Sequence, residues 1–197
     1  SYMNVKEIAG KKIILGSTSP RRKQLLAEAG FVFEVRTADT DEDFDPSMDV
    51  YEVAAHLAER KALALKHTLG SDEILVTADS VVILDNRIYG KPIDEKDACR
   101  IIGELAGHCH TVVTGVCVMT QDENIVFDDH TEVCFAPLTT EEIQYYVDKY
   151  KPLDKAGSYG IQDWIGLCKV RSINGSYANV MGLPVHRLYE VLMGFHV

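Results

Sequence analysis

Cysteine is scarce in this sequence, and its few cysteines follow no familiar pattern. The chain has five, at positions 99, 109, 117, 134 and 168, and no two are spaced as C-x-x-C. An odd number of scattered cysteines is typical of neither a disulfide framework nor a zinc site. We therefore expect reduced thiols, as in proteins of the cytoplasm.

Long apolar runs and net positive charge are also missing. No uncharged apolar run approaches the roughly 20 residues of a membrane-spanning helix, and the first ten residues lack the apolar core of a signal peptide. The formal net charge is −10, whereas nucleic-acid binding draws most of its affinity from cations on phosphates. The sequence predicts a cytoplasmic protein with no membrane and no nucleic-acid partner.

Three common binding motifs are absent. There is no G-x-x-x-x-G-K-[ST], which excludes a Walker-type kinase or ATPase, and there is also no G-x-G-x-x-G. The acidic stretch 38–49 is not an EF-hand, because counting from Asp41 places Pro46 where that loop needs glycine. This stretch is either a solvated loop or one that reaches a Mg²⁺ ion bound with phosphates.

Strand-like apolar runs alternate with helical patterns, which predicts an α/β fold. The length of 197 residues favours a single domain, residues 1–197. The segment "QDEN" at 121–124 separates two apolar runs and predicts a hairpin, so we expect a mixed sheet. The predicted strands span residues 12–15, 32–36, 74–84, 111–119, 124–136 and 167–173. The predicted helices span residues 20–29, 50–68, 95–106, 139–149 and 184–193.

Two arginines stand where a helix should begin. In "GSTSPRRKQLL", Ser19 and Pro20 are typical of an N-cap and a first helical residue, so Arg21 and Arg22 fall in the first turn. Cations are unfavourable at this end of the helix dipole. Either the arginines are simply solvated, or a bound anion such as phosphate completes the site.

A carboxylate interrupts the apolar run "ILVTADSVVIL". Asp79 stands in the middle of this predicted buried strand, where an ionised group is costly unless it is paired or bound to metal. We favour a functional role over a structural one.

Two lysines and one glutamine are further candidates. Lys61 falls on the apolar stripe of the predicted helix 50–68, so it either extends toward solvent or meets a buried anion. Lys91, in the turn "YGKP", is equally consistent with a phosphate contact and with an exposed position on the surface. Gln162, in the glycine-rich "DKAGSYGIQD", has an amide that can donate to and accept from a base edge.

Taken together, these stretches resemble the Maf family of nucleoside triphosphate pyrophosphatases. The resemblance covers nearly the whole chain and follows the order of the family's motifs. The matching segments are "LGSTSPRRKQLL", "DTDED", "LAERKA", "TADSVV", "YGKP", "LAGHCHTVVTGV", "DKAGSYGIQ" and "GSYANVMGLP".

The resemblance implies a mixed central sheet flanked by helices, with two lobes around a deep cleft, as in inosine triphosphate pyrophosphatases. It implies hydrolysis of a nucleoside triphosphate between its α and β phosphates, with Mg²⁺ or Mn²⁺. It assigns Asp79 as proton acceptor, with Glu42 and Asp79 as metal candidates. Phosphate-contacting positions fall on Ser17, Arg21, Arg22, Lys61 and Lys91, and substrate-selecting positions on Arg21, Ser80 and Gln162.

Among family branches, "ADS" and "YGIQ" look closest to the one acting on dTTP and UTP. They look less like the branch acting on 7-methylguanosine triphosphate. Two departures are notable: Ser80 replaces the commoner threonine, and Asp163, followed by Trp164, replaces the usual glycine after Gln162. The latter change affects the predicted base pocket.

Two alternatives remain at this point. A non-catalytic nucleotide-binding regulator of cell division would use the same arginines and act through protein partners. A sugar-phosphate or nucleotidyl transferase would need a second acceptor pocket, for which the sequence has no motif. The sequence also leaves open whether "GSYANVMGLP" forms a homodimer surface or packs the core.

Overall fold

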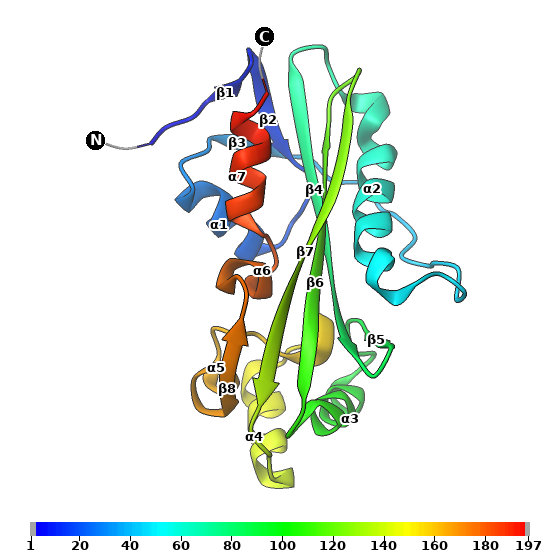
Figure 1. Ribbon diagram of the computed structural model, residues 1–197, viewed down its shortest axis with the longest axis vertical. Coiled ribbons are helices and arrows are strands. Elements are labelled where there is room, and N and C mark those ends of the chain that lie inside the picture. The colour runs from blue at the N-terminus through cyan, green and yellow to red at the C-terminus, as the bar shows by residue number, and fades with distance from the viewer. Residues whose placement is uncertain (1–2, 196–197) are drawn as a thin grey trace. The chain divides into compact units, whose positions relative to one another are not determined.

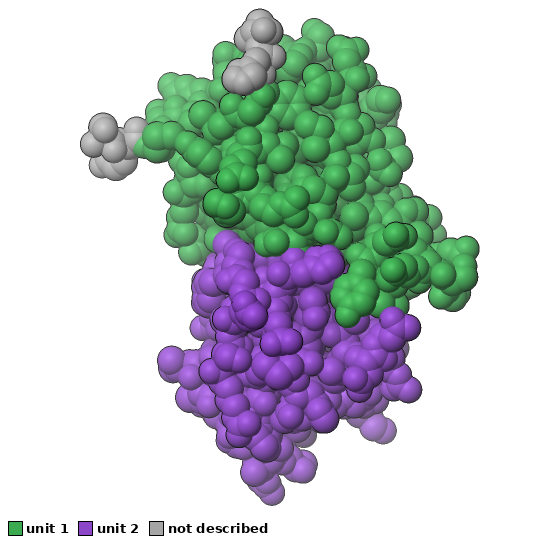
Figure 2. Space-filling model, in the orientation of Figure 1, with its two compact units in different colours: residues 1–79, 114–129, 182–197 green, residues 80–113, 130–181 purple. Residues whose placement is uncertain are grey.

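The computed structural model describes residues 3–195. The chain forms two compact units, coloured separately in Figure 2. Unit 1 comprises residues 1–79, 114–129 and 182–197, and unit 2 comprises residues 80–113 and 130–181. Three strands, β4, β6 and β7, contribute residues to both units.

Within the described residues the strands form one sheet in the order β1-β2-β4-β6-β7-β8, with β3 paired to β2 and β5 paired to β4. Strand β2 runs parallel to β3 and β4, whereas the β1–β2, β4–β5 and β7–β8 pairs are antiparallel. The predicted mixed sheet is therefore confirmed. The strands are β1 Glu7–Ile8, β2 Lys11–Leu15, β3 Phe33–Val35, β4 Glu73–Leu84, β5 Arg87–Tyr89, β6 Cys109–Met119, β7 Asn124–Phe135 and β8 Val170–Asn174.

The predicted helices are all present, and two short ones are added. The α-helices are α1 Pro20–Glu28, α2 Val53–Leu65, α3 Glu95–Leu105, α4 Thr140–Tyr150, α5 Trp164–Lys169, α6 Tyr177–Met181 and α7 Val185–Met193. Single 3₁₀ turns, Val50–Glu52 and Lys66–Thr68, extend α2 at both ends. A third 3₁₀ turn covers Ala156–Ser158.

In unit 1, helix α2 packs closely against the sheet. Its apolar stripe and residues of β2, β4 and β6 form one buried cluster. Gly115 of β6 makes this approach feasible, because a Cβ there would lie 2.3 Å from the backbone nitrogen of Ala55. In Figure 1, α2 lies to the right of β4 and β6, and α1 and α7 lie to their left. Helices thus flank the sheet, as the sequence predicted.

In unit 2, a buried aromatic cluster joins β6, β7 and the glycine-rich segment. The rings of His110, Phe135 and Tyr159 meet edge to face, with centroids 4.9 to 5.4 Å apart. His110 Nε2 and the Tyr159 hydroxyl are hydrogen-bonded at 2.6 Å. Burial lowers the pKa of His110 to about 4, so its imidazole is neutral at neutral pH.

The predicted strand 167–173 is only partly correct. Residues 167–169 belong to α5, and β8 begins at Val170. The apolar pattern did not separate the two elements, because a short apolar run fits either a strand or a helical turn. The sequence also missed β1, β5 and α6, which are at most five residues long.

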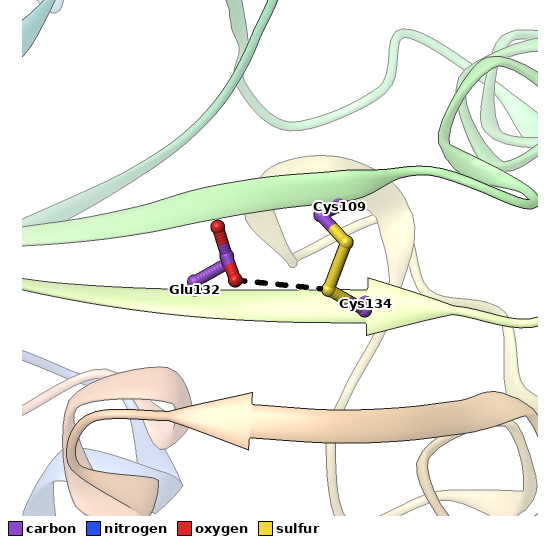
Figure 3. The surroundings of a disulfide bond; sticks show 3 residues. All are labelled: Cys109, Glu132 and Cys134. Atoms are coloured by element: carbon purple, nitrogen blue, oxygen red, sulfur yellow. Dashed lines mark hydrogen bonds between the residues drawn. A yellow bond between two sulfur atoms is a disulfide. The ribbon is translucent and has the colours of Figure 1, made fainter.

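The expectation that all five cysteines are reduced thiols is wrong for two of them. Cys109 of β6 and Cys134 of β7 form a disulfide (Figure 3), while Cys99, Cys117 and Cys168 are free. The backbone N–H of Phe135 donates to the carbonyl of His108, so residues 108 and 135 face each other as a hydrogen-bonded pair. The next pair along the two strands, 109 and 134, is therefore non-hydrogen-bonded, and the side chains of such a pair lie closer together. Strand pairing created this disulfide, which a search for C-x-x-C spacing does not detect.

The described helices are all too short or too polar to cross a membrane. The longest α-helix described, α2, has 13 residues. This agrees with the short apolar runs of the sequence.

Candidate functional site

The first turn of α1 has the predicted architecture. Ser19 is the N-cap, and its hydroxyl accepts a hydrogen bond from the backbone N–H of Arg22 at 3.3 Å. Pro20 is the first helical residue, and no acidic residue lies in the first turn. Ser17 lies just before the helix, and its hydroxyl accepts from the backbone N–H of Ser19 at 3.1 Å. A hydroxyl, helix N–H groups and two guanidinium groups therefore gather at one helix terminus.

Arg22 is held by a segment far away in the sequence. Its Nε donates to the backbone carbonyl of Gly182 at 2.7 Å. Removal from water lowers the pKa of the Arg22 guanidinium, and the neighbouring Arg21 acts in the same direction, whereas the carboxylates of Asp79 and Glu42 oppose the shift. Arg22 is therefore a fixed cation within the electrostatic range of two carboxylates.

The carboxylate of Asp79 meets the ammonium of Lys61. Lys61 Nζ lies 2.8 Å from Asp79 Oδ1 and donates also to the carbonyl of Ala78 at 3.3 Å. Of the two predicted alternatives for Lys61, the buried anion is correct. Glu42 Oε1 lies 4.0 Å from the same ammonium and is more exposed than Asp79.

The elements around Asp79 are tied together beneath this pair. Asp79 lies in the middle of β4, where only 9% of its surface is exposed. Two residues earlier, the buried hydroxyl of Thr77 donates to the carbonyl of Ala58 in α2 at 2.6 Å. This bond fixes the helix that carries Lys61 against the strand that carries Asp79.

Glu42 and Asp79 fit a hard divalent cation. Both carboxylates lie within 4.0 Å of one ammonium, so their oxygens face a common point that already holds a cation. Mg²⁺ is typically held by one or two carboxylates together with substrate phosphates, rather than by a complete cage of protein ligands. Two carboxylates beside Arg22 and Lys61 match that requirement.

The three other predicted residues belong to unit 2. Ser80 follows Asp79 in β4 and is half-buried. Lys91 is exposed, directly after Gly90, whose carbonyl accepts from the backbone N–H of Gly157 at 3.1 Å. That bond joins the "YGKP" turn to the glycine-rich segment. Gly157 has a φ of +70°, and a Cβ there would lie 2.6 Å from Val82, so this joint requires glycine.

Gln162 lies in a tight turn of the same segment. Its side chain is exposed, whereas the preceding Ile161 is only 6% exposed. The backbone N–H of Asp163 donates to the carbonyl of Gly160 at 3.0 Å, which closes the turn. The turn therefore presents the amide of Gln162 to solvent.

Sequence reasoning missed the role of Gly182 in holding Arg22. The segment "GSYANVMGLP" had been assigned only to a dimer surface or to core packing, and the positive φ of Gly182, +125°, shows an irregular backbone there. The glycine before Leu183-Pro184 was the available signal, because such a glycine often marks a chain reversal.

A second group of metal-ligand side chains carries no metal site. Sulfur atoms of Cys109 and Cys134 and a carboxylate oxygen of Glu132 lie within 4.8 Å of one another. The two sulfurs are bonded to each other (Figure 3), so they offer no thiolate to a metal. While this disulfide is formed, the cluster has only the Glu132 carboxylate to offer a metal.

Comparison with known proteins identifies the family of this chain. A profile of the Maf-like protein family matches residues 12–195. A dTTP/UTP pyrophosphatase of Parabacteroides distasonis is 50% identical over 185 residues, which cover 93% of this chain and 96% of that protein. Proteins of the same name are 50% identical in Phocaeicola vulgatus and 47% in Porphyromonas gingivalis, covering 92% and 93% of this chain and 94% of each relative.

Among solved structures, the Ham1 protein of Staphylococcus aureus aligns with a TM-score of 0.45 and 15% identity, covering 63% of this chain and 71% of that one. The family profile spans nearly the whole chain, and curated relatives are far above 30% identity over more than nine tenths of it. This chain belongs to the Maf-like protein family.

Proposed function

We propose that this chain is a metal-dependent nucleoside triphosphate pyrophosphatase acting on dTTP, UTP or related nucleotides, including modified ones. The products are the nucleoside monophosphate and pyrophosphate. The observation that carries the proposal is the ion pair between Lys61 and the nearly buried Asp79, with Glu42 and Arg22 around it. The names of the curated relatives support the substrate class.

Asp79 serves as the proton acceptor in this proposal. It orients a water molecule, takes its proton, and the water oxygen attacks the α-phosphorus while the bond to the α–β bridging oxygen breaks. Lys61 holds the Asp79 carboxylate in place, because its ammonium lies 2.8 Å from Oδ1. General-base assistance of this kind contributes about 10²- to 10⁴-fold in rate.

The cations hold the triphosphate. Arg22, fixed through Gly182, and Arg21 present guanidinium groups at a helix N-terminus, where phosphate oxygens also meet backbone N–H groups. Ser17 and Lys91 are assigned to phosphate contacts as well. A Mg²⁺ or Mn²⁺ ion held by Glu42 and Asp79 would neutralise charge on the phosphates and the leaving pyrophosphate.

Base selection is assigned to Arg21, Ser80 and Gln162. The exposed amide of Gln162 both donates and accepts, as recognition of a pyrimidine edge requires. Ser80 supplies a hydroxyl in a half-buried position. These roles come from the family resemblance and are the part of the proposal that a substrate panel tests most directly.

We also propose that residues 1–197 act as one domain. The family profile matches residues 12–195, which include parts of both units, and β4, β6 and β7 contribute to both units. We also propose a cytoplasmic location, where the reducing conditions would open the Cys109–Cys134 bond. We propose no nucleic-acid partner. A homodimer stays a prediction, which a measurement of the molecular mass of the native protein would check.

The decisive experiment is pyrophosphate release from a nucleotide panel, with Mg²⁺, Mn²⁺ or EDTA. The panel contains dTTP, UTP, CTP, the purine triphosphates and several modified bases. We expect metal-dependent release from dTTP and UTP, lost by at least about 100-fold in Asp79→Asn, which keeps the shape and removes the base. Asp122→Asn, on the exposed hairpin turn, is the matched control and should retain activity.

Near-wild-type turnover in Asp79→Asn would contradict the assigned role of this residue. If the wild type hydrolyses nothing but a nucleotide raises its melting temperature, the chain is instead a nucleotide-binding regulator. Protein partners would then be the next question.

A further inference from the structure

We propose that Tyr146 and Asp163 are positioning residues for base selection: together they lock the turn that presents Gln162. The inference rests on the proposed function, because it gives Gln162 the task of reading the base. It concerns a tyrosine on α4 that no motif singled out and an acid that departs from the usual family residue.

The turn is held at both of its ends by one hydroxyl. The Tyr146 hydroxyl donates to Asp163 Oδ2 at 2.6 Å and accepts from the backbone N–H of Gly160 at 2.9 Å. Gly160 and Asp163 are also the residues whose backbone hydrogen bond closes the turn, at 3.0 Å. Gln162 therefore lies between two anchor points that share the same oxygen atom.

Tyr146 is a rigid anchor. Tyr146 is 0% exposed, and its ring stacks on the ring of Tyr150, with the two centroids 5.0 Å apart. Helix α4, which carries both rings, begins with a capping box between Thr139 and Glu142. Burial and the bond to Asp163 both raise the pKa of the Tyr146 hydroxyl, so it stays protonated and remains a donor.

Asp163 connects the turn to the helix that follows. It is the N-cap position of α5, and its carbonyl accepts from the backbone N–H of Gly166 at 3.0 Å. A Cβ at Gly166 would lie 1.8 Å from the carbonyl oxygen of Ile161, so the helix packs directly against the turn. The Asp163 carboxylate folds back over Gly160, where a Cβ would lie 2.8 Å from Oδ2.

The physical consequence is a preorganised amide. A glutamine on a loose loop loses conformational entropy when it binds a base, and that loss weakens binding. A turn locked by three hydrogen bonds has already lost its backbone freedom during folding. A hydrogen-bonding site rejects the wrong base strongly only when its polar groups cannot move to new partners.

The test compares wild type with Tyr146→Phe, which removes the shared oxygen and keeps the ring. We expect the ratio of kcat/KM for dTTP to that for CTP to fall about 5- to 20-fold, mainly through KM for dTTP. Inhibition by inorganic tripolyphosphate, which has no base, should stay within 2-fold or so. Tyr145→Phe, on the same helix with an exposed side chain, is the matched control and should leave the ratio unchanged.

Asp163 provides a second pair of variants in case Tyr146→Phe folds poorly. Asp163→Ala removes the acceptor and should lower the same ratio. Asp163→Asn keeps an acceptor oxygen, so its ratio should lie between that of Asp163→Ala and that of wild type. The single tryptophan of the chain, Trp164, follows directly, so its fluorescence reports the turn in every variant.

An unchanged ratio in folded Tyr146→Phe and Asp163→Ala would overturn the inference, even if both melt at lower temperature. If the wild type hydrolyses no nucleotide, it is the proposed function that fails. The inference is then judged by dTTP and CTP binding measured through Trp164 fluorescence. The inference would be overturned if wild type and variants preferred dTTP over CTP equally, or if none of them bound either nucleotide.

Discussion

The ammonium of Lys61 lies 2.8 Å from Oδ1 of Asp79. Each residue by itself is unusual in its element. Lys61 places a cation on the apolar stripe of a helix, and Asp79 places a carboxylate inside an apolar strand. Together they satisfy each other, because α2 packs against β4 at this point. The pair combines two local irregularities in one charged centre.

Replacement of Lys61 by methionine should reduce both stability and turnover. The change keeps the apolar stem but leaves the Asp79 carboxylate, whose side chain is 13% exposed, without its ammonium. Loss of a partner at such a site costs about 1 to 3 kcal/mol. Urea unfolding and pyrophosphate release would measure the two effects.

Lys66→Met, at an exposed position of the 3₁₀ turn after α2, is the matched control. It should leave stability within about 0.5 kcal/mol of wild type. Equal stability and turnover in the two lysine variants would contradict a role for the Lys61–Asp79 pair.

Arg22→Lys should weaken nucleotide binding although it keeps the positive charge. Lysine lacks the Nε–H that bonds Gly182 at 2.7 Å and cannot grip two phosphate oxygens with a planar fork. We expect KM for dTTP to rise about 10-fold, equivalent to the loss of one charge-assisted hydrogen bond. Steady-state kinetics would show this. Arg171→Lys, at an exposed position of β8, should change KM little, and an equal change in both variants would contradict the assignment.

Buried His110 should make the protein less stable in mild acid. Its pKa is about 4 in the folded chain against an ordinary 6.5. Between these pH values the unfolded chain binds a proton that the folded chain does not, so the free energy of unfolding falls as pH falls from 6.5 to 4. The total from this residue is about 3 kcal/mol.

Urea unfolding at a series of pH values would test this. His110→Gln should flatten the curve in that window, because the amide does not titrate. His108→Gln, at an exposed position two residues earlier, should leave the slope as in wild type. Identical slopes in all three proteins would show that His110 is not the group responsible.

The Cys109–Cys134 bond should be visible by thiol counting and should stabilise the isolated protein. Without reductant, three of the five cysteines should react in denaturant, because two are bonded. A cross-link separated by 25 residues contributes about 3 kcal/mol in the chain-entropy description. Reductant should therefore lower the melting temperature of wild type but not that of a Cys109→Ser, Cys134→Ser double variant. Five reactive thiols before reduction would contradict the bond.

The principal helices and strands were predictable from local pattern. Ser19 and Pro20 set the start of α1, and the apolar stripe of α2 set its buried face, because caps and periodicity act over a few residues. The short elements were not predictable. A five-residue strand such as β8 forms because β7 offers it hydrogen-bond partners, and its own residues do not require it.

The same division holds for the candidate site. Arg22, Lys61 and Asp79 were each anomalous in the sequence, since a cation at a helix N-terminus or a charge in an apolar run violates elementary electrostatics. The contact between Lys61 and Asp79, the anchoring of Arg22 by Gly182 and the locking of the Gln162 turn by Tyr146 join residues 14 to 160 positions apart.

The sequence by itself determined the α/β class, the main helices and strands, the family and the residue types that carry the charge. Only the tertiary structure decided which of these residues meet. In the tertiary structure Lys61 forms an ion pair with Asp79 and does not simply extend into solvent. Cys109 and Cys134 form a disulfide and are not free thiols. The reason is physical: propensity, capping and periodicity are set by neighbours along the chain. Ion pairs, disulfides and side-chain anchors depend on which strands and helices pack together.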